Sequence, residues 1–224
     1  MLRSPSIAAL LLVAPVSTGL AIQVRDSSLR IAENAALRCI NDATGDSTGC
    51  KVWDSGRALS SILEGMELSG KTVLELGSGT GVGGLTAATC GASVLLTDGA
   101  ASMVSLLEQN VATNRDVMQQ CVRGLYRLRW GDEDEVAAVA DCVQSPFDLI
   151  IGSDLLYAPE TFPVLLETLT ELCTPGHTEV LFTYPTRYTE GIFFEQAASH
   201  FDELASVEEV QPCIFASRLV LREE

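Results

Sequence analysis

Apolar and polar positions follow two alternating spacings along most of the chain. From Thr72 onward, short runs that are almost wholly apolar are each followed by a stretch with apolar residues every three or four positions. The short runs are typical of buried parallel strands and the longer stretches of amphipathic helices. The predicted strands cover residues 72–77, 93–98, 125–130, 147–154 and 179–185, and helices follow them at about 81–89, 101–114, from within 132–140, 160–172 and 188–200.

The two ends of the chain depart from this alternation. Residues 22–24 and 29–31 could form short strands, residues 41–49 form a loop, and a helix with Asp54 or Ser55 as its N-cap ends by Gly65. Residues 203–210 and 214–221 follow each other with no helix between them, which suits an antiparallel hairpin. We therefore predict an α/β fold, a three-layer α/β/α sandwich with a mostly parallel seven-stranded sheet and an antiparallel C-terminal hairpin.

Length and composition favour one domain. A chain of 224 residues that is 47% hydrophobic suits a single core, which we place in residues 22–224. Residues 1–21 carry Arg3, an apolar run from Ile7 to Val16 and then small residues, which is the layout of a signal or transit segment. The run is too short to span a bilayer, and Pro15 interrupts it. A targeting segment and an ordinary frayed N-terminus both remain open.

The charge and the scattered cysteines exclude several function classes. The net charge of −16 would repel a nucleic-acid backbone, so we expect no nucleic-acid partner. The 7 cysteines lie far apart without a C-x-x-C pair, and the 2 histidines are isolated. We expect no metal site and find no combination of residues that indicates a Ser/His/Asp triad.

A glycine-rich turn follows the strand that begins at Thr72. Gly79, Gly81 and Gly84 satisfy the dinucleotide pattern G-x-G-x-x-G, and Asp98 lies near the distance expected for a residue that binds ribose hydroxyls. Such glycines let backbone N–H groups approach a ligand closely. An NAD-dependent oxidoreductase is therefore one hypothesis.

Two features of this turn argue against a dinucleotide. The first glycine after the strand is Gly77, so the third position of the dinucleotide pattern, counted from there, falls on Val82. Glu75 would repel a pyrophosphate, whereas it suits a cofactor that brings an ammonium group.

Five elements in order resemble a known family. They are Trp53, the run ELGSGTG at 75–81 with Asp98 ending the next strand, Trp130-Gly131, the run SDLLY at 153–157, and Arg187. This combination resembles the seven-strand S-adenosylmethionine-dependent methyltransferases, and within them the family 16 group, whose characterised members are mostly protein-lysine methyltransferases. The resemblance implies a Rossmann-like sandwich, S-adenosylmethionine as cofactor, no metal, a protein lysine as acceptor, a monomer and a cytoplasmic location.

The resemblance also implies roles for individual residues. Gly77, Ser78 and Gly79 approach the methionine moiety, and Glu75 also binds the cofactor. Asp98 accepts the ribose hydroxyls, Trp130 lies against the adenine, and Trp53 and Ser153 line the methionine end. Asp154 and Tyr157 border the acceptor site. Methyl transfer requires an in-line alignment of the acceptor nitrogen. We expect Asp154 to orient the acceptor first and to accept a proton second. A non-catalytic binding module with this fold remains the third hypothesis.

Overall fold

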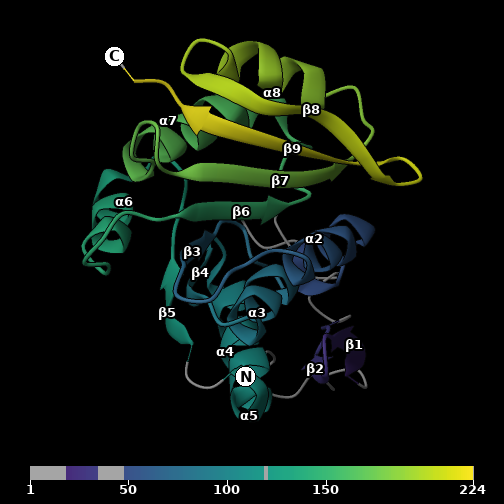
Figure 1. The fold of residues 1–224 in the computed structure, drawn as a ribbon. Coiled ribbons are helices and arrows are strands. Elements are labelled where there is room, and N and C mark those ends of the chain that lie inside the picture. Colours follow the sequence, from purple (N-terminus) through teal and green to yellow (C-terminus); the bar gives the residue numbers. More distant parts are fainter. Residues whose placement is uncertain (1–18, 35–47, 119–120, 224) are drawn as a thin grey trace, which may run out of the picture.

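The computed structural model describes residues 19–34, 48–118 and 121–223, and it confirms the predicted α/β fold (Figure 1). One seven-stranded sheet has the order β5-β4-β3-β6-β7-β9-β8. Its strands are β3 (Thr72–Glu75), β4 (Ser93–Asp98), β5 (Val122–Arg127), β6 (Leu149–Ser153), β7 (Glu179–Pro185), β8 (Phe201–Gln211) and β9 (Ile214–Leu221). The first five strands are parallel, and the β8–β9 hairpin is antiparallel. The chain adds β4 and β5 on one side of β3 and then adds β6 and β7 on the other side, so the strand order reverses next to β3. Ligands in open α/β sheets bind at such a reversal.

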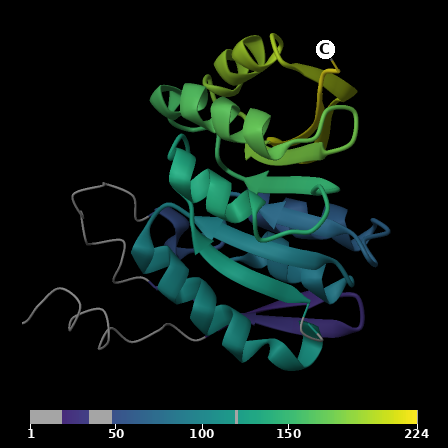
Figure 2. The ribbon, with the colours of Figure 1, turned by 90° about the vertical axis from the view of Figure 1, so that its left-hand side faces the viewer.

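Helices cover both faces of the sheet, because neighbouring strand residues point to opposite sides. Leu74 and Ile150 join a buried cluster with α6, α7 and α8, whereas Val73 and Ile151 join a second cluster with α2, α3 and α4. Figure 2 shows the strands as one twisted layer with helices packed along it. The helices are α2 (Asp54–Glu64), α3 (Val82–Thr89), α4 (Ala101–Thr113), α5 (Arg115–Met118), α6 (Glu133–Ala140), α7 (Phe162–Leu172) and α8 (Glu190–Ala197), with short 3₁₀ turns at η2 (Thr48–Cys50) and η3 (Pro159–Thr161). None of the helices in the described ranges is long and apolar enough to cross a membrane.

The N-terminal hairpin confirms the two weakly patterned strands. β1 (Leu20–Val24) pairs with β2 (Ser27–Ile31), apart from the main sheet. The side chain of Asn110 ties the segment after this hairpin to the glycine turn: its amide oxygen accepts the N–H of Ala32 at 2.8 Å and its nitrogen donates to the Thr80 carbonyl at 2.8 Å. β1 begins inside the predicted targeting segment, so cleavage after Ala21 would remove its first two residues. Targeting and cleavage stay predictions, and residues 1–18 lie outside the described part.

Some predicted boundaries were wrong. β5 ends at Arg127 and not at Trp130, because its partner β4 ends at Asp98, which lies opposite Arg127. Trp130 therefore stands in the loop beyond the strand. The cap position of α2 is Trp53 rather than Asp54 or Ser55. Most of the predicted loop at 41–49 lies outside the described residues.

We predict that Phe162 is a major anchor of the cluster beneath α7. Its ring is fully buried and packs edge-to-face on Phe193, with centroids 5.5 Å apart. Phe162→Ala should lower the free energy of unfolding in urea by about 3–5 kcal/mol, since it removes an aromatic ring and leaves a cavity. Tyr188→Ala is the matched control, because Tyr188 is 96% exposed. This control should change the free energy of unfolding by less than about 0.5 kcal/mol. Equal stability of the two variants would contradict this packing.

Candidate active site

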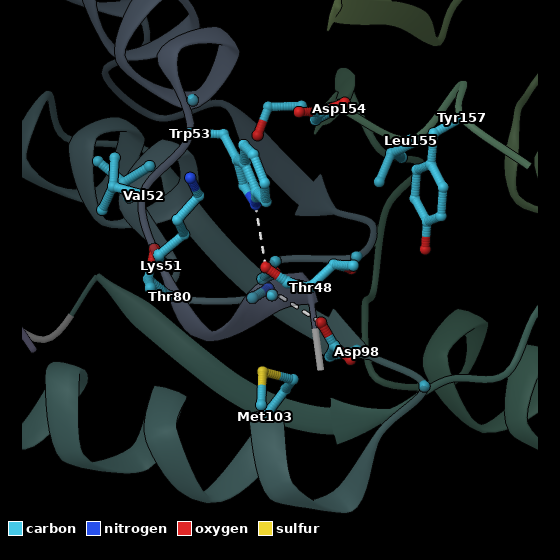
Figure 3. A pocket seen from close by; sticks show the side chains of 18 of the residues that line it. Thr48, Lys51, Val52, Trp53, Thr80, Asp98, Met103, Asp154, Leu155 and Tyr157 are labelled. Carbon is cyan, nitrogen blue, oxygen red and sulfur yellow. Dashed lines mark hydrogen bonds between the residues drawn. The ribbon is translucent and has the colours of Figure 1, made fainter. Parts of the chain in front are cut away.

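A pocket of about 330 Å³ opens at the carboxyl ends of β3, β4 and β6 (Figure 3). Its walls come from the segment before α2, the glycine turn after β3, the end of β4, the loop after β5 and the loop after β6. Nine of the ten residues that the sequence proposed for the site line it, namely Trp53, Gly77, Ser78, Gly79, Asp98, Trp130, Ser153, Asp154 and Tyr157. Residues that lie as much as a hundred positions apart in the chain therefore surround one cavity.

The glycine turn needs glycine for both conformation and space. Gly77 and Gly79 have φ values of 55° and 53°, in the left-handed region that favours glycine. A Cβ on Gly77 would lie 2.7 Å from Leu155, and one on Gly79 would lie 2.7 Å from the Gly49 carbonyl oxygen. The turn is held in place because the Ser78 N–H donates to the Thr97 carbonyl at 2.8 Å. The backbone of this turn is thus exposed to the pocket in a fixed shape.

Asp98 joins the glycine turn to the end of β4. Its carboxylate accepts the Gly79 N–H at 2.9 Å through one oxygen and the Ala100 N–H at 3.0 Å through the other. The residue is only 8% exposed, and it still lines the pocket. Because a carboxylate can accept several hydrogen bonds, Asp98 presents an acceptor group to a ligand in the pocket.

Asp154 and Arg187 form an ion pair on the pocket wall. Asp154 adopts a φ of 59°, which is uncommon for a residue other than glycine, and its N–H donates to the Thr183 carbonyl at 2.8 Å. It does not cap the following helical turns, whose cap positions are Ala158 and Thr161. The structure therefore favours a site role for Asp154 over a capping role. The sequence noted Arg187 but did not anticipate its pairing with Asp154.

Two aromatic side chains stand at the mouth of the pocket. Trp53 is 37% exposed and Tyr157 is 40% exposed. The indole N–H of Trp53 donates to the Thr48 carbonyl at 2.9 Å, which fixes the ring. The ammonium of Lys51 lies over this ring, 3.5 Å from its centroid. Lys51 was not predicted as a site residue. The one indication in the sequence is that it lies two residues before Trp53.

Glu75 is the one proposed residue that does not line the pocket. Its carboxylate is 2% exposed and lies against the first turn of α3, where a Cβ on Gly84 would lie 2.9 Å from it. Burial raises the pKa of Glu75 to about 8, although the Ser78 hydroxyl and the N–H groups of Gly84 and Gly83 lower it. At neutral pH the protonated form predominates. The expected attraction between a Glu75 carboxylate and a cofactor ammonium is therefore corrected: the side chain supports α3 from below.

No group of three or more His, Cys, Asp and Glu side chains that could hold a metal ion is found among the described residues. The titratable residues that line the pocket within those ranges are Lys51, Asp98, Arg129, Asp154, Tyr157 and Arg187. The pocket thus offers backbone donors, carboxylates and aromatic faces, which suit an organic ligand with hydroxyl groups and a flat ring.

Comparisons with known proteins show which chains resemble this one. A sequence model of a family described as lysine methyltransferase matches residues 32–201. Protein N-lysine methyltransferase METTL21A of Danio rerio is 35% identical over 179 residues, which cover 79% of this chain and 78% of that protein. EEF1A lysine methyltransferase 3 of Xenopus tropicalis is 31% identical over 173 residues, covering 76% of this chain and 68% of that protein.

Solved structures share the fold. The structure of SMU.776 complexed with SAH has a TM-score of 0.61 at 16% identity and covers 92% of this chain and 57% of its own. Magnesium protoporphyrin IX methyltransferase from Synechocystis PCC 6803, with bound SAM, has a TM-score of 0.57 at 16% identity and covers 84% of this chain and 92% of its own. Both confirm the Rossmann-like arrangement of the sheet.

We predict that Glu75 makes the stability of the protein depend on pH. Its folded pKa of about 8 lies above its ordinary value of 4.5, so its favourable contribution is complete below pH 4.5 and is lost as the pH rises to about 8. Glu75→Gln has the same shape and does not titrate. The free energy of unfolding of the unmodified protein, measured in urea, should therefore fall relative to this variant between those pH values, by about 1.4 kcal/mol for each unit of pKa shift. Parallel pH profiles of the two proteins would rule out the buried acid.

Proposed function

The chain belongs to the lysine methyltransferase family, and from that premise we propose a role for each part of its pocket. The family resemblance found in the sequence is confirmed, and it favours methyl transfer over the NAD-dependent oxidoreductase. We infer that S-adenosylmethionine binds in the pocket and that a lysine side chain of another protein accepts the methyl group. The observation that carries this proposal is the convergence on one cavity of nine residues that the family resemblance implied.

The pocket fits the cofactor in both shape and donor chemistry. Leu155 and Gly49 lie so close to Gly77 and Gly79 that neither residue has room for a Cβ, so the turn presents backbone without side chains to the methionine moiety. Asp98, positioned by the N–H groups of Gly79 and Ala100, presents a carboxylate that can accept hydrogen bonds from the ribose hydroxyls. Trp130 is half-buried in the wall and offers an apolar surface for the adenine. When bound, S-adenosylmethionine supplies a methyl group that its sulfonium already activates.

The acceptor end of the pocket orients an amine and excludes water. A free lysine has a pKa of about 10.4, so less than about 0.1% of it is neutral at pH 7. The apolar wall at Leu155 disfavours the charged form, while Asp154 attracts the incoming ammonium and fixes its position. Asp154 is already paired with Arg187, so the incoming lysine competes with that guanidinium. Asp154 therefore orients the acceptor first and takes up its proton second.

The choice of partner follows from charge. The chain has a net charge of −16. Two exposed acids lie close in sequence to the aromatic residues at the pocket mouth: Asp54 follows Trp53, and Glu160 lies shortly after Tyr157. A basic segment that carries the target lysine is thus the acceptor that we propose, and nucleic acid is not expected to bind. We further propose that the protein acts as a monomer, since the proposed residues that line the pocket all come from one chain.

Replacement of Asp98 tests cofactor binding. Asp98→Ala should weaken binding of S-adenosylmethionine at least about 100-fold, because each hydrogen bond to a charged group is worth about 1.5–3 kcal/mol. Isothermal titration calorimetry of the folded variant measures this. Asp134→Ala, which removes an exposed acid in α6, is the control and should leave the affinity unchanged. Unchanged binding by Asp98→Ala would remove Asp98 from the site.

Replacement of Asp154 separates acceptor orientation from cofactor binding. Asp154→Asn should lower kcat about 100-fold, since misplacing the acceptor by about 1 Å has that effect, while the cofactor affinity stays within about twofold. Transfer of tritiated methyl groups to lysine residues of a cell extract measures the rate. Glu171→Gln, an exposed change on α7 away from this pocket, is the control. Full activity of Asp154→Asn would contradict the orienting role.

A further inference from the structure

Lys51 lines the same pocket as the proposed acceptor residues. Its ammonium lies over the Trp53 ring, 3.5 Å from the centroid, and Figure 3 shows the Lys51 side chain directed toward that ring. A cation on an aromatic face is also how aromatic sites hold ammonium and methylammonium groups. A lysine of the chain itself therefore occupies the kind of position that an acceptor lysine would take.

The backbone around Lys51 is fixed on both sides. Cys50 and Val52 are buried, at 1% and 8% exposure. The Cys50 carbonyl accepts the Asn34 N–H at 2.9 Å, and the Val52 N–H donates to the Glu33 carboxylate at 2.7 Å. Because these contacts hold both neighbours, the Lys51 side chain projects from a rigid base toward the pocket.

The same segment lies directly on the glycine turn. The Gly49 backbone packs so closely on Gly79 that a Cβ on either residue would collide with the other. The proposed methionine end of the cofactor, at Gly77 to Gly79, and the base of Lys51 are therefore adjacent. A reacting amine and a methyl donor that share one rigid frame react with a high effective concentration.

The other lysine of the chain provides a built-in contrast. The sequence contains two lysines, Lys51 and Lys71. Lys71 lies just before the amino end of β3, whereas the pocket lies at the carboxyl ends of the strands. The Lys71 ammonium pairs with the Asp148 carboxylate at 2.9 Å. It does not line the pocket. Only one of the two lysines is thus placed to meet a bound methyl donor.

We propose that Lys51 is a site of self-methylation, which rests on the proposed binding of S-adenosylmethionine. The Lys51 ammonium first releases a proton to water. Its nitrogen lone pair then forms a bond to the sulfonium methyl carbon, while the S–CH₃ bond breaks and its electron pair returns to sulfur, which yields S-adenosylhomocysteine and methyl-Lys51. The product amine still carries a positive charge when protonated, so it keeps its attraction to Trp53.

The test uses the full-length protein with no other protein present. The protein is incubated with S-adenosylmethionine that carries a deuterated methyl group, and its peptides are mapped by mass spectrometry. We expect deuterated methyl groups on Lys51 and none on Lys71. The fraction labelled with time should not change over about a hundredfold dilution, because the transfer is intramolecular. A fraction that falls with dilution would show transfer between molecules and overturn the proposal.

Two matched variants and one binding measurement complete the test. Lys51→Arg keeps the positive charge over Trp53 and should lose all label, whereas Lys71→Arg should keep it. Calorimetry with S-adenosylmethionine distinguishes a failure of the self-methylation proposal from a failure of the proposed function. Binding and labelling of extract lysines without label on Lys51 would overturn self-methylation alone. Absence of binding by the folded protein would overturn the proposed function together with it.

Discussion

The hydrogen bond between the Asp98 carboxylate and the Gly79 N–H is the contact on which the site depends. One oxygen of Asp98 holds the glycine turn after β3, and the other holds the N–H of Ala100 at the start of α4. A strand end, a tight turn and a helix start therefore meet at a single carboxylate. Because the left-handed glycines could adopt many other conformations, this charge-assisted bond gives the turn one shape in which its backbone faces the pocket.

The N-terminal segments complete the pocket from the other side. Asn110 links the Thr80 carbonyl to the backbone of Ala32, and Gly49 rests on Gly79. Trp53 lies a few residues after Gly49 and lines the same pocket as the turn, and the Asp154–Arg187 ion pair also lines this pocket. In the proposed assignment, cofactor binding depends on the sheet, and acceptor binding depends on segments that the sheet positions. This division explains why the proposed roles of Asp98 and Asp154 can be separated by experiment.

The sequence predicted the features that follow from local pattern. Buried parallel strands are continuous apolar runs, so the positions of β3, β4, β6 and β7 were evident, and Asp98 and Ser153 followed from where such runs end. The end of β5 was not evident, because it is set by the length of its neighbour β4 and not by its own residues. The same holds for side-chain direction: Glu75 follows the strand alternation to the face that α3 covers, beside the helix and away from the pocket. Lys51 was missed because its role depends on a cation–aromatic contact, which no spacing rule reveals.

The central claim is that the pocket at the carboxyl ends of β3 and β4 is the cofactor site. A crystal structure of the protein grown with S-adenosylhomocysteine tests it most directly. We expect density for the nucleoside in this pocket, with both ribose hydroxyls within hydrogen-bond distance of the Asp98 carboxylate and the adenine against Trp130. Density for the ligand elsewhere, such as in the groove between α7 and α8, or a ribose that makes no contact with Asp98, would contradict the account.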